Sequence, residues 1–340
     1  MKFRRFAEIL ALTLCVCAFG ACNRNNDDDD NGTLSGSVSF YMPVYVLRGH
    51  TYTIHPTGAI HPEGKGLGYY IMTSWDYYTR DTIQYETSPA VTDLAYDVHV
   101  PDTLAKELRV ECYAYAENYY TKSLIETFVA VSDTLDVTIT GLDYSDSDTT
   151  IVDSRDDKVY HTTKIGEKEW FKHNLAYAGK GIPYGKCDAM INNYGNYYTW
   201  NEAKEACPEG WHIPDGEEWL AVANYIAGEG TFGKYDNFDG IAGDFMVNAK
   251  FIGDRMWEYW PQVKITNKVR FNALPVGFCN DSGSGYPKFF GPDESCAFWT
   301  ADEAGASRAY VRYFYSTQPD VLIADVDKDS FRASVRCVKD

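Results

Sequence analysis

Residues 207–219 read CPEGWHIPDGEEW, a stretch that combines one cysteine, one histidine, two tryptophans and four acidic residues. Such a mixture fits a metal site, a catalytic site or a structural segment. Asp215 and Glu218 have the spacing of a capping box, which predicts that a helix begins just after Asp215. Trp219 would then lie on the apolar face of that helix. The helix alone accounts for two of the four acids.

The chain around this stretch predicts a domain that mixes strands with short helices. Residues 159–175 have the pattern of a hairpin that turns at Gly166. Thr199 and Glu202 form a second capping box and predict another short helix. Three further stretches have the composition of strands, at residues 270–278, 309–316 and 330–340. In the last of these we expect alternate residues to point inward: Phe331, Ala333, Val335 and Cys337.

These segments together resemble a known family. KIGEKEWFKHNLAY, GNYYTWNEAKEACPEGWHIPDGEEW, FNALPVGF, CAFWTADE and FRASVRCVKD are similar, in order and spacing, to the Fibrobacter succinogenes major paralogous domain, over nearly all of residues 158–340. The resemblance implies a C-type-lectin-like α+β fold, shared with formylglycine-generating enzymes, in which the first and last strands pair. It also implies a disulfide between Cys207 and Cys337. We expect Cys279 and Cys296, in the loop-rich half, to form a second bridge.

The opening stretch is therefore interpreted mainly as structural. His212 has no second histidine or cysteine at metal-ligand spacing, so a locally hydrogen-bonded strand histidine is favoured over a zinc ligand. The chain also lacks a CxxC pair and an HExxH motif. We expect neither a metal nor a cofactor.

The N-terminus predicts export and lipidation. Residues 1–22 place basic residues before an apolar run that is shorter than the roughly 20 residues of a membrane span, as in a secretory signal. The end of this run, FGAC, resembles a bacterial lipobox and makes Cys22 the predicted lipidated residue. Residues 23–35 contain four consecutive aspartates and predict an unfolded tether. Such acidic runs resemble the signal that sends Bacteroidota lipoproteins to the outside of the outer membrane, although a plain spacer is the alternative.

Residues 36–142 predict an all-β domain. Short segments rich in Val, Ile, Thr and Tyr alternate with Gly, Pro and Asp, which is typical of an antiparallel sandwich. The segment resembles Ig-like or PKD-like modules of surface proteins. Cys112 is the one cysteine here, so we expect a buried free thiol. Residues 143–157 are rich in Asp, Ser and Thr and predict a linker.

Charge and cysteine content limit the functional classes. The formal net charge is −18, which disfavours nucleic acid as a partner. Six of the nine cysteines lie after the predicted lipobox, in a compartment where disulfides persist. Cys187 has no predicted partner. The fold class we expect is multidomain, an N-terminal all-β Ig-like sandwich followed by a C-terminal α+β C-type-lectin-like domain.

Catalysis has little support in the sequence. A formylglycine generator would need a pair of thiols near the C-terminus, where Cys337 stands alone. The QPD triplet at residues 318–320, used by calcium-dependent lectins, falls after the tryptophan strand rather than before it. A metal-independent binding module remains, and fold resemblance alone does not carry an activity.

Aromatic residues in two loop-rich segments are the candidates for ligand binding, because such rings stack on sugars or anchor protein partners: Trp257, Tyr259, Trp260, Tyr286, Phe289 and Phe290. The alternative for each is a place in the core. We expect a lipoprotein anchored in the outer membrane and facing the exterior, which binds an extracellular glycan or protein. A formylglycine-type modifying enzyme and a structural component of a fimbrial or surface assembly are the alternatives.

Overall fold

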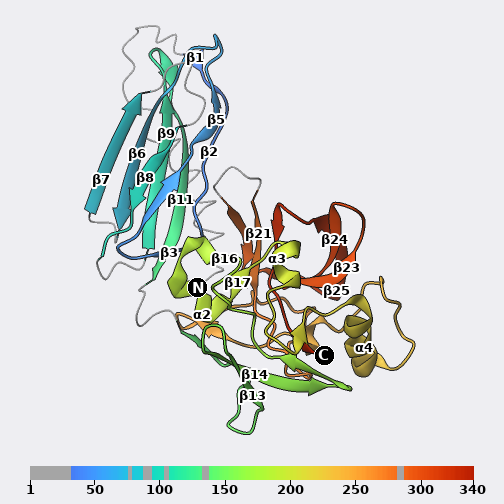
Figure 1. Ribbon diagram of the computed structural model, residues 1–340. Helices are drawn as coiled ribbons and strands as arrows, with labels where there is room; N and C mark the ends of the chain where they lie inside the picture. Colours follow the sequence, from blue (N-terminus) through green and yellow to red (C-terminus); the bar gives the residue numbers. More distant parts are fainter. Residues whose placement is uncertain (1–31, 76–78, 87–93, 103–106, 132–137, 282–286) are drawn as a thin grey trace.

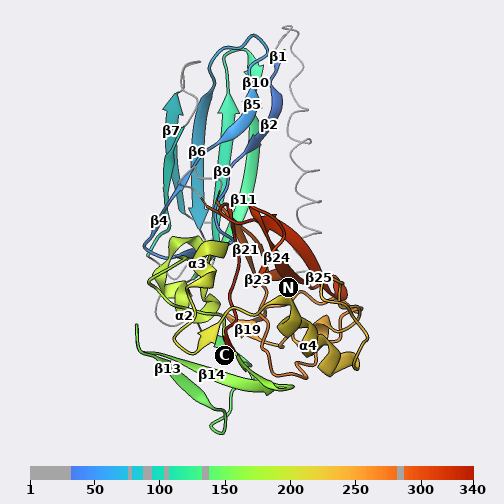
Figure 2. The same ribbon diagram turned by 45° about the vertical axis from the view of Figure 1, so that its right-hand side comes forward.

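The computed structural model describes residues 32–75, 79–86, 94–102, 107–131, 138–281 and 287–340. The predicted signal, Cys22 and most of the predicted tether lie outside these residues. The chain is β-rich and has two parts. An elongated β domain, drawn in blue and cyan, stands on one end of a second part built of strands, short helices and long loops (Figures 1 and 2).

The N-terminal part contains one long sheet and several short strand pairs. Its strands are β1 (Gly32–Thr33), β2 (Ser35–Ser39), β3 (Tyr45–Leu47), β4 (Thr51–Ile54), β5 (Thr57–Ile60), β6 (Gly68–Trp75), β7 (Thr79–Glu86), β8 (Tyr96–His99), β9 (Glu107–Tyr115), β10 (Tyr119–Tyr120) and β11 (Lys122–Val131). The long sheet has the order β3-β11-β9-β6-β7, while β2 pairs with β5, β4 with β8 and β1 with β10. Apolar residues from the long sheet and from the short pairs share one core.

Strand β9 shows why this part folds as layers. Leu108, Val110, Cys112 and Ala114 are buried, as the alternation of apolar and polar residues in this segment of the sequence indicates. Glu111 is the exception, because it is buried although it points to the other face. Its carboxylate is held there by Arg109, at 2.9 Å, and by the Tyr113 hydroxyl, at 2.6 Å.

The predicted all-antiparallel pairing is wrong at one edge. Strand β3 pairs with β11 in parallel, and β1 pairs with β10 in parallel. The reason for the first lies in residues 37–47, SVSFYMPVYVL, whose composition alone predicts one strand. Met42 and Pro43 separate β2 from β3, and because proline has no N–H to donate, the chain leaves the β2–β5 pair there and joins the long sheet.

The second part is built around two sheets. Its elements are β12 (Ile139–Thr140), β13 (Thr150–Asp153), β14 (Lys158–Ile165), β15 (Lys168–Phe171), β16 (Ile182–Pro183), η1 (Tyr184–Lys186), η2 (Asp188–Met190), α2 (Ile191–Tyr194), β17 (Asn196–Tyr197), α3 (Trp200–Lys204), β18 (Trp211–His212), α4 (Gly216–Ala227), η3 (Ala242–Asp244), β19 (Lys250–Phe251), β20 (Asp254–Arg255), β21 (Val276–Asn280), β22 (Lys288–Pro292), β23 (Ser295–Glu303), β24 (Arg308–Tyr315), β25 (Gln318–Asp327), β26 (Phe331–Arg332) and β27 (Val338–Lys339). One sheet has the order β13-β14-β15-β27-β18 and the other β22-β21-β23-β24-β25, with β26 on β21.

Local sequence signals are confirmed in this part. The hairpin β14–β15 turns at Gly166, and both predicted capping boxes are present, at α3 and at α4. Strand β27 lies between β15 and β18, so the last strand pairs with the second strand of the early hairpin and not, as the resemblance implied, with the first strand of the domain.

Two predicted strands are shorter than their sequence pattern indicates. In residues 270–278 the strand begins only at Val276, after Pro275 and after Arg270 and Asn272, which both have a φ of 56°. In residues 330–340 the predicted inward set is buried, but Ser334 and Arg336 between them are buried as well. From Ala333 to Val338 neither face meets solvent, so alternation does not describe this stretch.

The predicted linker, residues 143–157, is part of the folded second domain. Strand β13 lies within it and pairs with β14, and Asp153 is fully buried. The low apolar content that suggested a linker reflects carboxylates that bind cations of the neighbouring elements.

Candidate functional site

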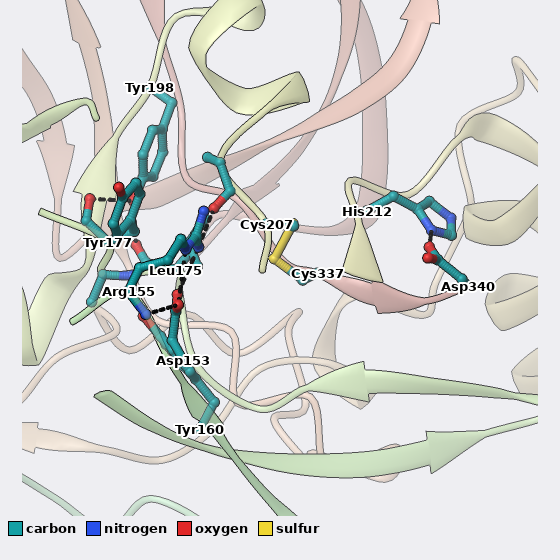
Figure 3. The surroundings of a disulfide bond; sticks show 12 residues. Asp153, Arg155, Tyr160, Leu175, Tyr177, Tyr198, Cys207, His212, Cys337 and Asp340 are labelled. Atoms are coloured by element: carbon teal, nitrogen blue, oxygen red, sulfur yellow. Dashed lines mark hydrogen bonds and ion pairs between the residues drawn. A yellow bond between two sulfur atoms is a disulfide. The ribbon is translucent and has the colours of Figure 1, made fainter. Parts of the chain in front are cut away.

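The Cys207–Cys337 disulfide joins the segment after α3 to the end of the chain just before β27, and this confirms the predicted bridge (Figure 3). The segment before Cys207 is fixed a second time. Arg155 donates to the Ala206 carbonyl at 2.7 Å and to Asp153 at 2.8 Å, and its guanidinium lies 3.8 Å from the centre of the Tyr177 ring. The segment that ends at Cys207 is therefore held by the disulfide and by Arg155, which also forms an ion pair with the buried carboxylate of Asp153.

The side chain of His212 is held by hydrogen bonds to two carboxylates of the same domain. Nδ1 lies 2.6 Å from Asp340 and Nε2 lies 3.0 Å from Glu218, so both ring nitrogens have carboxylate partners. Glu218 also accepts from the Asp215 amide in the capping box of α4. In the part of the chain that the structure describes, no group of three or more His, Cys, Asp or Glu side chains is arranged to hold a metal ion.

The predicted second bridge is wrong, because Cys279 and Cys296 are both free thiols. Strands β21 and β23 are parallel neighbours, and their register places Gly277 opposite Cys296. Cys279 therefore lies further along β21 and is not opposite Cys296. Burial raises the pKa of Cys279 to about 12 and raises that of Cys296 as well. These thiols are poor nucleophiles near neutral pH.

The other two thiols are also buried. Burial raises the pKa of Cys112 to about 12, as expected for a free thiol in the core of the N-terminal part. Cys187 is buried too, and its sulfur lies 3.2 Å from the Tyr52 hydroxyl of the N-terminal part. Both residues serve packing.

The structure divides the predicted aromatic set. Trp257 is 1% exposed and donates its indole N–H to the Ala273 carbonyl at 3.1 Å. Phe289 is 5% exposed and packs on Tyr184 and Tyr197. The prediction that these two residues face a ligand is therefore wrong, because the loops turn them into the core. Tyr286 lies outside the described residues.

Three members of the set are exposed. Tyr259 is 67% exposed and Trp260 is 42% exposed, and we call these two adjacent residues the aromatic pair. Phe290, on β22, is 41% exposed and packs its ring against Phe278 on the next strand. The predicted set therefore gives one contiguous surface element, the aromatic pair, and one separate ring.

The loop that carries the aromatic pair is hydrogen-bonded to another segment on its N-terminal side and closed by a turn of its own on the other. Before it, Trp257 is buried and the Glu258 amide donates to the Asp293 carbonyl at 3.0 Å. After it, the Val263 amide donates to the Trp260 carbonyl at 3.2 Å. The guanidinium of Arg255 lies 5.8 Å from the centre of the Tyr259 ring. Because its backbone is already held, this surface would lose little conformational entropy on binding.

A cluster of charges around two buried residues, Asp148 and Lys172, was not predicted from the sequence. The Asp148 cluster consists of Asp143, Asp148, Lys172 and Arg270. Lys172 is fully buried and lies 2.7 Å from Asp148, and Arg270 lies 2.9 Å from Asp148 and 2.8 Å from Asp143. Burial opposes ionisation of Asp148, but the hydrogen bonds from Lys172 and the Ser145 amide outweigh it and lower the pKa to about 2.

Arg336 is a second missed residue. Its guanidinium is buried, donates to the Asn272 carbonyl at 2.8 Å and to the Asn174 side chain at 2.9 Å, and lies 4.4 Å from the centre of the Phe271 ring. Burial lowers its pKa to about 9. The aspartates in the predicted linker were a sequence signal for the Asp148 cluster, because acids with few basic neighbours in sequence can pair with cations from other segments. No sequence signal indicated that Arg336 would be buried.

Comparison with known proteins identifies the second part of the chain. Residues 163–339 match the Fibrobacter succinogenes major domain. A superoxide reductase (neelaredoxin) variant from Ignicoccus hospitalis is a matching solved structure, with 9% identity over 28% of this chain and 81% of that one. Its TM-score of 0.23 is too low to indicate a shared fold. No curated protein matches the sequence. Of the helices described here, none is long and apolar enough to cross a membrane.

Proposed function

The chain belongs to the Fibrobacter succinogenes major domain family, and we propose that it is a non-catalytic recognition protein that binds an extracellular glycan or protein through Tyr259 and Trp260. The observation that carries this proposal is the contrast within one loop. Trp257 is buried and hydrogen-bonded, whereas the two aromatic residues just after it stand in solvent on a fixed backbone. Exposed aromatic rings on a rigid support are typical binding anchors.

The cysteines support a binding role over catalysis. A modifying enzyme of the formylglycine-generating type would need reactive thiols, but Cys337 is tied to Cys207 and burial raises the pKa of the free thiols. A stable disulfide between the early helix and the last strand instead makes the second part a rigid support.

The finer fold assignments and the location belong to the same proposal. We interpret the N-terminal sandwich as Ig-like and the second part as C-type-lectin-like, the latter supported by the pairing of β15 with β27 and the bridge beside it. The basic and apolar residues before Cys22, the lipobox-like FGAC and the acidic segment after it support a Bacteroidota-type lipoprotein anchored in the outer membrane and facing the exterior.

The test is a binding screen with matched variants. The oxidised protein is applied to an array of bacterial and mammalian glycans and to immobilised mucin, fibronectin and collagen. We expect at least one ligand to be retained, and the double variant Tyr259→Ala/Trp260→Ala to lose it by about tenfold or more. Tyr225→Ala, which removes a similarly exposed ring from α4, is the control and should bind normally. Equal binding by the double variant would refute the assignment.

A further inference from the structure

The far end of the N-terminal domain contains a cavity of about 550 Å³. It lies around β1 and β10, at the end of the long sheet opposite the second part of the chain (Figures 1 and 2). Its size falls within the range of small-molecule and oligosaccharide pockets. The side chains that line it combine rings with charged and amide groups: His61, Glu63, Lys65, Tyr115, Glu117 and Tyr119.

Two glycines allow the rings to take their places. A Cβ on Gly68 would lie 2.2 Å from Cζ of Tyr115, which is its cross-strand partner, so the Tyr115 ring covers bare backbone. A Cβ on Gly32 would lie 2.5 Å from the Tyr119 ring. Any other residue at either position would displace a ring from the cavity wall.

A row of tyrosines on the long sheet begins at Tyr115, which lines the cavity. Tyr70 stacks on Tyr113 with ring centres 4.5 Å apart, and the Tyr115 ring lies 6.0 Å from Tyr70. All three rings are partly exposed and project from β6 and β9. We call Tyr70, Tyr113 and Tyr115 the tyrosine row. It extends the cavity along the sheet, as a site for a chain-like ligand would require.

Polar groups surround the rings at the rim of the cavity. Glu63 and Lys65 form an exposed ion pair at 2.6 Å, and Glu117 and Asn118 are exposed. His61 is buried, its Nδ1 accepts from the Glu63 amide at 3.1 Å, and its ring lies 4.6 Å from that of Tyr119. The rim therefore offers both hydrogen-bond donors and acceptors.

This combination favours one ligand class. Sugars present apolar ring faces that stack on aromatic rings and hydroxyls that need donors and acceptors together. The core of a protein–protein interface is flatter and poorer in charged groups. An anionic glycan is disfavoured, because two carboxylates face one ammonium here and the whole chain has a net charge of −18. We propose that the cavity and the tyrosine row bind a neutral saccharide chain, at a site separate from the aromatic pair.

Affinity electrophoresis of the whole protein tests this site. Native gels contain soluble β-glucan, mannan, xylan or, as an anionic probe, heparin. We expect at least one neutral polysaccharide to retard the wild type, and Tyr119→Ala to weaken that affinity about tenfold. Tyr120→Ala is the matched control, since Tyr120 is the adjacent residue, is exposed and does not line the cavity. It should migrate like the wild type.

Two further variants separate the site from the rest of the molecule. Glu117→Gln changes one exposed side chain and leaves the fold intact, and it should lower the affinity severalfold. Tyr259→Ala/Trp260→Ala should retain full retardation, because the aromatic pair belongs to the second part of the chain. Three results would each overturn the proposal. No neutral polysaccharide retards the wild type, only heparin retards it, or Tyr119→Ala binds as well as the wild type. Loss of retardation in the aromatic-pair variant alone would move the saccharide to that site.

Discussion

Trp257 and Trp260 lie in the same loop, but Trp257 is buried and Trp260 is exposed, so we expect them to have different roles. We expect Trp257→Ala to lower the free energy of unfolding by about 3 to 5 kcal/mol, because it leaves a cavity and removes one of the two hydrogen bonds that the Ala273 carbonyl accepts, the other coming from the Val247 amide. Trp260→Ala should change it by no more than about 0.5 kcal/mol, as is usual for surface positions. Urea denaturation of both variants measures the difference. Comparable losses would show that Trp260 also belongs to the core.

His173 makes stability depend on pH. Burial and the nearby Arg336 lower its pKa from about 6.5 to about 3, so the folded protein keeps the imidazole neutral while the unfolded chain protonates it. Stability is therefore full above about pH 6.5 and is lost progressively as pH falls toward 3. Between pH 7 and pH 5 this single group should cost about 1 to 2 kcal/mol.

His173→Asn isolates this contribution. Asparagine can still accept the hydrogen bond that the Tyr144 hydroxyl makes with Nδ1 at 2.8 Å, but it has no proton to gain. The variant should show a smaller loss of unfolding free energy between pH 7 and pH 5 in urea titrations. An unchanged pH dependence would mean that other groups set it.

The residues that were predictable from sequence are those with local roles. Asp215 and Glu218 satisfy each other within one turn, so their spacing alone identifies the cap. The burial of Trp257 and the exposure of Tyr259 depend on contacts with Ala273 and Arg255 that no short pattern contains. Arg336 is harder still, because a fully buried arginine contradicts the usual preference of its side chain.

The disulfide is the main constraint between elements of the second part. It closes a loop with a sequence separation of 130 residues, which corresponds to about 4 to 5 kcal/mol in the chain-entropy treatment. We expect Cys207→Ala/Cys337→Ala to lose about that much stability, measured as a lower midpoint in urea unfolding, with a slope that rises because the unfolded chain without the cross-link exposes more surface. Cys112→Ala, which removes a free buried thiol, should cost less than the double variant.

Elements were predicted best where their signals are local. The β14–β15 hairpin has its turn residue and flanking strands within one segment, and it forms as expected. The division of β2 from β3 depends on a distant partner, β11, and the folding of the first half of the predicted linker depends on cations from other elements, Lys172 and Arg270. Patterning could not show these, because an acidic segment is polar whether its carboxylates face solvent or buried cations.

The two parts of the molecule share one continuous core, which the predicted linker did not suggest. Tyr45 donates its hydroxyl to Asp293 at 2.8 Å, and its ring packs edge-on against Phe251 at 5.1 Å. The Val44 amide donates to the Tyr184 hydroxyl at 3.0 Å, and the Tyr52 hydroxyl lies 3.2 Å from the sulfur of Cys187. The two parts should therefore behave as a single rigid unit and should not move independently of each other.

Calorimetry checks this coupling. The wild type should unfold in one cooperative transition, because separating the parts would expose the rings around Tyr45. Tyr45→Ala should lower stability by about 2 to 3 kcal/mol and broaden or split the transition, whereas Tyr45→Phe should lose only the hydrogen bond, about 1 to 2 kcal/mol. Two separate transitions in the wild type would show that the parts fold independently.

The central claim is that the protein binds its ligand without altering it. The most direct test is a titration with the ligand that the array identifies, carried out on the wild type, on Tyr259→Ala/Trp260→Ala and on Tyr225→Ala. Calorimetric titration gives the affinity, and mass spectrometry of the recovered ligand shows whether it was altered. We predict about tenfold or weaker binding by the double variant, normal binding by Tyr225→Ala, and a ligand of unchanged mass. A chemically modified ligand, or equal affinity in all three proteins, would contradict this function.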